Sequence, residues 1–169
     1  MKYLLALLFL FGCKEEQKLD VVAKVDLQRY LGTWYEIARL PAKFENGCVG
    51  VTATYSLNED GTIKVVNRCR LHKLDGELKE ATGIARVCDL NTNAKLKVQF
   101  FWPFSGDYWI IELANDYSYA VVGTPNRQYM WVLSRTPFME NALYNQIIER
   151  ARAKGFDVDK LEKPVQINL

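Results

Sequence analysis

The amino-acid sequence predicts an all-β protein, an eight-stranded antiparallel up-and-down barrel with a C-terminal α-helix packed on its outside. Three observations lead to this fold class. Short runs rich in β-branched and aromatic residues recur from residue 33 onward, with turn residues between them. The connections between these runs are too short to hold crossover helices. After residue 137 the apolar spacing changes to that of a helix.

Each of the eight runs is predicted to be a strand. They lie at residues 33–40, 48–57, 62–70, 79–89, 95–102, 107–114, 118–123 and 129–135. Neighbouring strands are expected to pair as antiparallel hairpins, because the connections are short and nearly all contain Gly, Pro, Asn or Asp. The strands could form a closed barrel or a sandwich. We favour the barrel, because its first strand meets its last and no edge is left exposed.

The segment "MENALYNQIIERARAKG" predicts the helix. Leu143, Ile147 and Ala151 recur at helical spacing, and charged residues occupy the opposite face. Gly155 is well placed to end the helix. A single apolar stripe indicates that the helix packs on one surface, most simply the outer wall of the barrel.

The N-terminal stretch "MKYLLALLFLFG" has the layout of a secretory signal. Its apolar run is shorter than the roughly 20 residues that a spanning helix needs. Gly12 followed by Cys13 resembles a bacterial lipobox, although Phe11 is bulkier than the usual residue there. We therefore expect a signal peptide at residues 1–12, a lipidated Cys13 with a flexible tether at 13–25, and the barrel domain at 26–169. The alternative is a soluble secreted protein in which Cys13 has no role.

Charge and residue types exclude several functions. Without Lys2, the 22 basic side chains become 21, against 20 acidic ones. The protein therefore has no strong positive electrostatic field that would attract nucleic acid. The single histidine, His72, falls in a predicted loop, and no serine elbow, phosphate-binding loop or Cys-x-x-Cys motif is present. The sequence therefore predicts neither an enzyme nor a protein with a cofactor or a metal.

Strand directions explain why a bulky residue, Trp34, begins the first strand. In an up-and-down barrel, the start of strand one and the end of strand eight lie at the same end, here called the closed end. Arg135 should therefore lie across the ring of Trp34 in a cation–π contact. The sixth strand brings the turn Asn115-Asp116-Tyr117 to the same end. Trp34 is predicted to plug the closed end rather than to serve as an ordinary core anchor.

The same directions suggest one disulfide. Cys48 begins the second strand and Cys69 ends the third, so both should lie at the opposite end of the barrel, here called the open end. Cys88 ends the fourth strand at the closed end and is expected to be free. Strict alternation places Cys48 and Cys69 on different faces, so their pairing requires a β-bulge.

These features resemble a known family. Gly32-x-Trp34, the turn containing Asp116, and Arg135 resemble the three conserved regions of the lipocalins, and the terminal helix extends the resemblance over about residues 26–158. The stretches "YLGTWYEIARLP", "VTATYSL" and "WVLSRTP" are similar to bacterial outer-membrane lipoprotein lipocalins in particular. The resemblance implies a barrel with an open mouth that binds fatty acids and lysophospholipids. The Cys48 and Cys69 pair and Phe11 depart from the best-known bacterial pattern.

Alternation along the strands and the resemblance together predict the residues that line the barrel and contact a ligand. They are Ala53, Tyr55, Val65, Asn67, Leu96, Val98, Phe100, Tyr108, Ile110, Val122, Tyr129 and Trp131. Several of them are small for a filled core, and Asn67 and the tyrosines add a few polar groups, as a ligand pocket requires. The alternative is a barrel filled by its own side chains.

Two functions remain open. The first is a lipid-anchored carrier of single-chain lipids, fatty acids or lysophospholipids, that serves envelope maintenance. The second is an anchored interaction module that acts on a protein partner through its open-end loops. Lys14 follows Cys13, where an inner-membrane retention signal typically has Asp, so a Gram-negative source predicts the outer membrane with the barrel facing the periplasm. A homodimer is a further expectation that the residues leave open.

Overall fold

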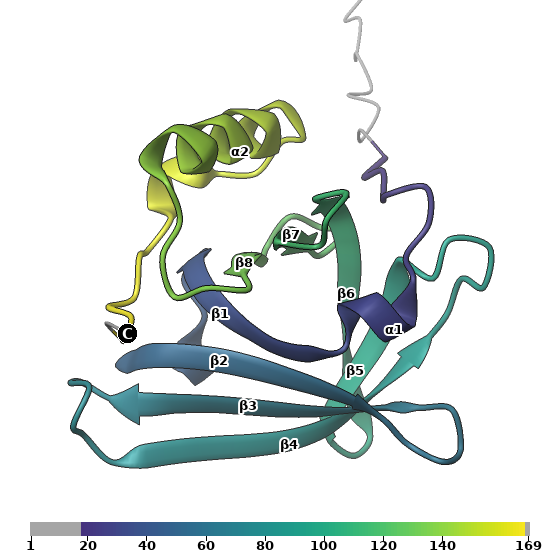
Figure 1. Ribbon diagram of the computed structural model, residues 1–169, viewed down its shortest axis with the longest axis horizontal. Helices are drawn as coiled ribbons and strands as arrows, with labels where there is room; N and C mark the ends of the chain where they lie inside the picture. Colours follow the sequence, from purple (N-terminus) through teal and green to yellow (C-terminus); the bar gives the residue numbers. More distant parts are fainter. Residues whose placement is uncertain (1–17, 168–169) are drawn as a thin grey trace, which may run out of the picture.

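The computed structural model describes residues 18–167 and contains the predicted closed barrel (Figure 1). The signal peptide and Cys13 lie outside the described residues. The strands are β1 (Gly32–Arg39), β2 (Cys48–Leu57), β3 (Ile63–Leu71), β4 (Leu78–Val87), β5 (Lys95–Phe101), β6 (Phe104–Leu113), β7 (Tyr119–Gly123) and β8 (Met130–Ser134). Each strand pairs with the next, and β1 pairs antiparallel with β8, so the prediction of a barrel over a sandwich is confirmed.

The strand limits differ from the predicted ones by up to three residues. The largest change is at β6, which begins at Phe104 rather than at residue 107. Phe101 of β5 pairs with Phe104, so the ladder continues to a turn formed by Trp102 and Pro103. The sequence prediction missed this extension because it treated Pro103 and Gly106 as part of one long turn.

Helix α2 (Asn141–Ala153) packs on the outer wall of the barrel, as predicted (Figure 1). Its buried residues Tyr144, Ile147 and Ala151 belong to an outer core with outward-facing residues of the sheet, among them Val121 and Val132. The short 3-10 helix η2 (Val158–Lys160) follows it. The inner core is separate and lies inside the barrel.

Residues 18–25 differ from the expected tether. Leu19 is buried in the outer core and Val25 is fully buried in the inner core. The backbone amides of Val22 and Val25 donate to the carbonyls of Ile110 and Thr92. The apolar side chains of this segment cover part of the barrel surface, so the segment packs along the barrel. It leads into a short helix, α1 (Leu27–Tyr30), which the sequence analysis did not predict.

The closed end has the predicted plug. Trp34 is fully buried, and the guanidinium carbon of Arg135 lies 3.7 Å from its ring centroid. Arg135 also donates to the carbonyls of Thr33, Arg29 and Tyr30, so it joins β1 to α1. Gly32 adopts a φ of +94°, and a Cβ at this position would lie 3.3 Å from Arg135 Nη1. Glycine is therefore required for both the backbone conformation and the approach of Arg135.

The turn at Asn115–Tyr117 lies at the same end. Arg29 of α1 donates to the carbonyl of Asn115 and stacks 4.0 Å from the ring centroid of Tyr117. The Tyr117 hydroxyl accepts from the Asp26 amide, and Asp116 caps the amide of Ser118. The turn thus holds α1 across the closed end.

A disulfide joins Cys48 and Cys69 at the open end, and Cys88 is free and exposed. The bulge that this pairing requires is present, because the register of β2 against β3 shifts between Val49 and Thr52. Gly50, inside the bulge, has a φ of +58°, a conformation that glycine adopts without strain. The bulge brings both sulfurs to one face, where they pack with Val51.

Replacing Trp34 tests the plug. Trp34→Ala should lower the free energy of unfolding by about 3–5 kcal/mol, as large core truncations do, whereas Arg135→Ala should cost less because its guanidinium is partly solvated. Urea unfolding of the two variants measures both. A Trp34→Ala protein with unchanged stability that had lost only ligand binding would contradict the structural role of this residue.

Candidate functional site

The barrel interior places most of the predicted lining residues together. The inner core includes Tyr55, Val65, Leu96, Ile110 and Val122 as buried members, and Ala53, Val98, Phe100, Tyr108 and Trp131 as partly buried ones. Asn67 pairs in register with the inward residue Ala53. Tyr129 lies outside this core, at the open end, where its ring stacks on Trp131 with centroids 5.9 Å apart.

The half of the interior next to the plug is densely filled. The hydroxyls of Tyr30 and Tyr55 are each hydrogen-bonded to the hydroxyl of Tyr108, at 2.8 and 2.9 Å. Burial raises the pKa of Tyr55 to about 12 and also raises the pKa values of Tyr30 and Tyr108. These three tyrosines stay neutral at physiological pH and form a polar layer with satisfied hydrogen bonds above Trp34.

The half next to the open end is more accessible. Val98, Phe100, Trp131 and Asn67 face inward, yet each keeps part of its surface accessible. The Oδ1 atom of Asn67 is buried and accepts no hydrogen bond. Mostly apolar walls with one unsatisfied acceptor are the usual composition of a small-molecule site.

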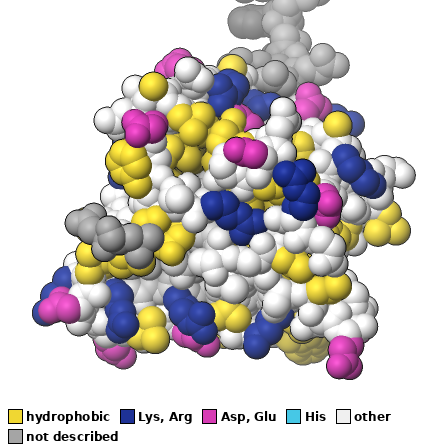
Figure 2. Space-filling model, in the orientation of Figure 1, with side chains coloured by type: hydrophobic (Ala, Val, Ile, Leu, Met, Phe, Trp, Pro, Cys, Tyr) yellow, Lys and Arg dark blue, Asp and Glu magenta, His cyan; other side chains and the backbone are white. Residues whose placement is uncertain are grey.

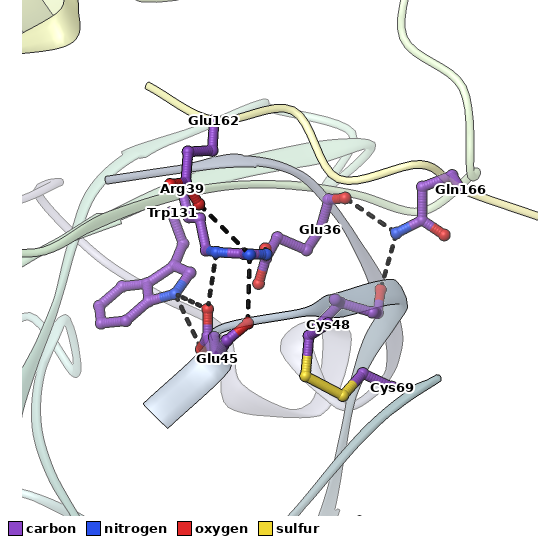
Figure 3. Close-up of polar contacts among 9 residues, drawn as sticks. Glu36, Arg39, Glu45, Cys48, Cys69, Trp131, Glu162 and Gln166 are labelled. Carbon is purple, nitrogen blue, oxygen red and sulfur yellow. Dashed lines mark hydrogen bonds and ion pairs between the residues drawn. A yellow bond between two sulfur atoms is a disulfide. The ribbon is translucent and has the colours of Figure 1, made fainter. Parts of the chain in front are cut away.

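A buried cluster of charged residues, Glu36, Arg39 and Glu45, lies at the open end (Figure 3). Arg39 Nη1 donates to Glu36 Oε1 at 2.7 Å, and Arg39 Nε lies 3.4 Å from Glu45 Oε2. Trp131 Nε1 donates to both oxygens of Glu45 at 3.3 Å. The more exposed Glu162 pairs with Arg39 from the outside. The sequence prediction missed this cluster.

A β-bulge in β1 explains the position of Arg39. The register of β1 against β8 shifts between Glu36 and Ala38. Consequently Ile37 and Ala38 both contribute to the outer core, and Arg39 lies opposite Trp131. Glu36 was predictable, because it lies two positions after the inward residue Trp34. Arg39 was not, since simple alternation places it outside.

Burial and the excess of carboxylates together set which side chains of the cluster are protonated. Burial, together with the charge of Glu45, raises the pKa of Glu36 to about 8 despite its hydrogen bond from Arg39. Burial also raises the pKa of Glu45, against the opposing effect of Arg39. At neutral pH Glu36 is therefore largely protonated, and Arg39 keeps its charge opposite Glu45.

The β1–β2 loop lies across the open end. It contains the 3-10 helix η1 (Lys43–Glu45). Glu45 holds the loop to β1 and β8 through Arg39 and Trp131. On the other side, Lys79 at the start of β4 donates to the carbonyl of Phe44 at 2.9 Å. The loop therefore bridges strands on opposite sides of the barrel.

The C-terminal segment closes the seam between β1 and β2 next to the cluster. The two strands pair directly only from Gly32–Tyr35 to Thr52–Tyr55. Beyond that, Arg39 exchanges backbone hydrogen bonds with Glu162, and the Gly50 amide donates to the carbonyl of Val165. The Gln166 side chain donates to the carbonyls of Glu36 and Val51, one on each strand (Figure 3).

Other parts of the described chain offer weaker candidates. Grooves outside the barrel run beside α2, one lined by Lys18 and Arg150 and another by Phe138 and Lys163. Neither gathers a cluster of buried polar groups comparable to that at the open end. No three His, Cys, Asp or Glu side chains among residues 18–167 are grouped as metal ligands. None of the helices in this range is long and apolar enough to cross a bilayer. The interior is therefore the candidate site.

The protonation of Glu36 predicts a pH-dependent stability. The folded protein holds this proton up to about pH 8, whereas an unperturbed carboxyl releases it near 4.5. The free energy of unfolding should therefore fall as the pH rises from about 5 to about 8, by at most about 1.4 kcal/mol per pH unit for this group. Glu36→Gln should flatten that profile, measured by urea unfolding at several pH values.

Glu162→Gln provides the matched control, because this carboxylate also pairs with Arg39 but is half exposed. It should leave most of the slope in place. An undiminished slope in Glu36→Gln would show that Glu36 is not the titrating group.

Comparisons with known proteins agree with this geometry. A family model described as a lipocalin-like domain matches residues 25–166. Temperature-induced lipocalin-1 of Arabidopsis thaliana is 41% identical over 162 residues, covering 90% of this chain and 85% of that protein. Outer membrane lipoprotein Blc of Vibrio cholerae is 45% identical over 141 residues, covering 83% and 82%.

A solved structure shows the same fold at lower identity. Insecticyanin from the tobacco hornworm Manduca sexta superposes with a TM-score of 0.69 at 20% identity, covering 89% of this chain and 85% of that one. Since the family model and both relatives cover most of the chain, this protein belongs to the lipocalin family.

Proposed function

We propose that this protein is a membrane-anchored lipid-binding protein that stores or carries single-chain lipids, fatty acids or lysophospholipids, inside its barrel. The observation that carries the proposal is the asymmetry of the interior. Trp34 and three tyrosines fill one half, whereas inward apolar side chains stay partly accessible in the other. An interior of this kind offers an apolar chain a site with a single entrance.

Polar groups at the entrance suit a lipid head. In the proposed pose the acyl chain runs inward past Phe100, Val98 and Trp131. The head remains at the open end, near Arg39 and Glu45. This pose buries the chain among apolar walls and keeps the polar head among charged groups, which avoids burying it unpaired.

Energetics favour ligands with one chain. Burying a methylene contributes about 0.8 kcal/mol relative to water, but this gain largely vanishes for a chain that starts inside a bilayer. Lipids that leave a membrane easily are therefore the better ligands, and these carry one chain. An eight-stranded interior is also only wide enough for one small ligand.

The names of relatives support the location. Several similar proteins are outer membrane lipoproteins, including those of Vibrio cholerae and Escherichia coli. Together with the lipobox-like Gly12-Cys13, this supports a lipid anchor on Cys13, an outer-membrane location and a barrel in the periplasm, where envelope maintenance would be its role. A binding protein also accounts for the site better than an enzyme, because Arg39 and Glu45 neutralise each other and Glu36 keeps its proton.

An inward bulky residue should block the site. Val98→Trp should abolish binding of lysophosphatidylcholine, measured by titration below its aggregation limit, without unfolding the barrel. Lys97→Trp is the matched control, because the neighbouring side chain is exposed on the outside of the same strand.

A two-chain phosphatidylcholine that bound wild-type protein as tightly as the single-chain lipid would contradict the proposed ligand class. Absence of any co-purified lipid by mass spectrometry, together with no titration signal, would favour the interaction module instead.

Removal of the anchoring thiol should release the protein. In a Gram-negative host, Cys13→Ser should move part of the protein from the membrane fraction to the soluble periplasmic fraction, because no acyl chain can be attached. Cys88→Ser is the control, since this free thiol lies at the closed end of the barrel. An acyl group on the Cys13→Ser protein, or an unmodified Cys13 in the wild-type protein, found by mass spectrometry would count against lipidation of Cys13.

A further inference from the structure

Exposed apolar side chains lie at the open end of the barrel. They belong to the β1–β2 loop, the start of β4 and the β5–β6 hairpin. Their exposed fractions are unusually high for such side chains: Phe44 56%, Leu78 49%, Phe101 77%, Trp102 86% and Phe104 76%. These five residues are called the open-end rim below. Exposed apolar groups of this size are costly in water unless they meet a partner.

The rim has two parts. The hydrogen bond from Lys79 to the carbonyl of Phe44 holds Phe44 next to the start of β4, where Leu78 lies. The second part is the β5–β6 hairpin, which is separate because β4 pairs with β5 only through Ile84–Val87, away from Leu78. Its tip, residues 100–105, reads "FFWPFS" and contains no charged residue. The most exposed part of the rim is thus also free of charge.

We propose that the open-end rim inserts into the surface of a lipid bilayer, so that the barrel opens directly onto one leaflet. This inference goes beyond lipid carriage, because it assigns a docking surface and its partner. Aromatic residues at a protruding tip are suited to the bilayer interface, where tryptophan is enriched. The rim also lies at the end of the barrel that leads into the site, so a lipid could pass between membrane and barrel without exposing its chain to water.

Charges around the rim indicate which membranes it would bind. Exposed basic and acidic residues alternate there: Lys43, Arg70, Lys73 and Lys79 against Asp75, Glu77 and Glu80. The same mixture of signs covers the face of the molecule shown in Figure 2. Because positive and negative side chains nearly balance, insertion of apolar groups, and not attraction to anionic lipids, should drive the docking.

The beginning of the described chain is compatible with this orientation. Lys18 and Lys154 line the same surface groove, and the Lys154 carbonyl accepts a hydrogen bond from Arg127 in the β7–β8 loop at the open end. Lys18 follows Cys13 by five positions, a distance of at most about 17 Å when extended. A lipid on Cys13 and the rim could therefore reach the same leaflet.

Vesicle binding of the unlipidated protein tests the proposal. The chain from Lys14 onward contains every described residue and lacks the anchoring thiol. It should float with large unilamellar vesicles of pure phosphatidylcholine, to the same extent in 0.1 M and 0.5 M salt. The double variant Trp102→Ser, Phe104→Ser should bind at least tenfold more weakly. Leu90→Ser is the matched control, because Leu90 is 78% exposed in the β4–β5 loop at the closed end, and it should bind like wild type.

Four results would overturn the proposal. The first is wild-type flotation by the rim variant, and the second is an equal loss in Leu90→Ser. The third is flotation only with anionic lipid and only at low salt, which would assign binding to basic side chains. Self-association of wild-type protein that the rim variant abolishes, without vesicle binding, would assign the rim to a second copy of the chain and would also overturn it.

The outcomes separate this proposal from lipid carriage. The rim variant should bind dissolved lysophosphatidylcholine within about twofold of wild type, since both replaced residues lie outside the barrel, but should extract it from vesicles more slowly. Vesicle binding without any lysophosphatidylcholine binding would refute lipid carriage and leave the docking surface intact.

Discussion

The contact of Arg135 with Trp34 is the interaction on which the rest of the structure depends. An eight-stranded barrel is open at both ends unless side chains or loops cover them. Trp34 fills one end, and Arg135 lies on its ring while donating to carbonyls of β1 and α1. One side chain thereby connects the last strand, the first strand and the helix that precedes it. With this end sealed, the interior can be reached only from the opposite end.

A second constraint is the bulge in β1. One extra residue between Glu36 and Ala38 turns Arg39 toward Glu36, Glu45 and Trp131. The three charged groups would each be costly to bury alone, but they are tolerated together because one guanidinium serves two carboxyls and one carboxyl keeps its proton. Pairing of β1 with β2 ends just before this bulge, at Tyr35 and Thr52, and the C-terminal segment with Gln166 occupies the seam beyond it.

The two ends of the barrel differ in chemistry as well as in access. Polar groups near the closed end are satisfied by one another, as the three hydrogen-bonded tyrosines show. At the open end, Asn67 retains an unsatisfied oxygen and apolar side chains face outward around the entrance. This gradient from a satisfied interior to an apolar rim agrees with the proposed exchange of lipid with a membrane. The disulfide between Cys48 and Cys69 joins β2 and β3 beside that entrance, where a bulge interrupts their hydrogen bonds.

The sequence by itself determined the barrel, the order of its strands, the outer helix and the plug. These features follow from local periodicity, from short connections and from strand direction, all of which can be read along the chain. Most of the lining residues were also predictable, because alternation is regular between Ala53 and Tyr55 or between Leu96 and Val98. Only the tertiary structure decided whether the side chains beyond each bulge face into the barrel or out of it. A single inserted residue reverses the inward and outward sense of every later position in a strand, so Arg39 could not be placed by alternation. The structure alone also revealed that residues 18–25 and 161–167 pack on the barrel, since their contacts are with residues far away in the sequence.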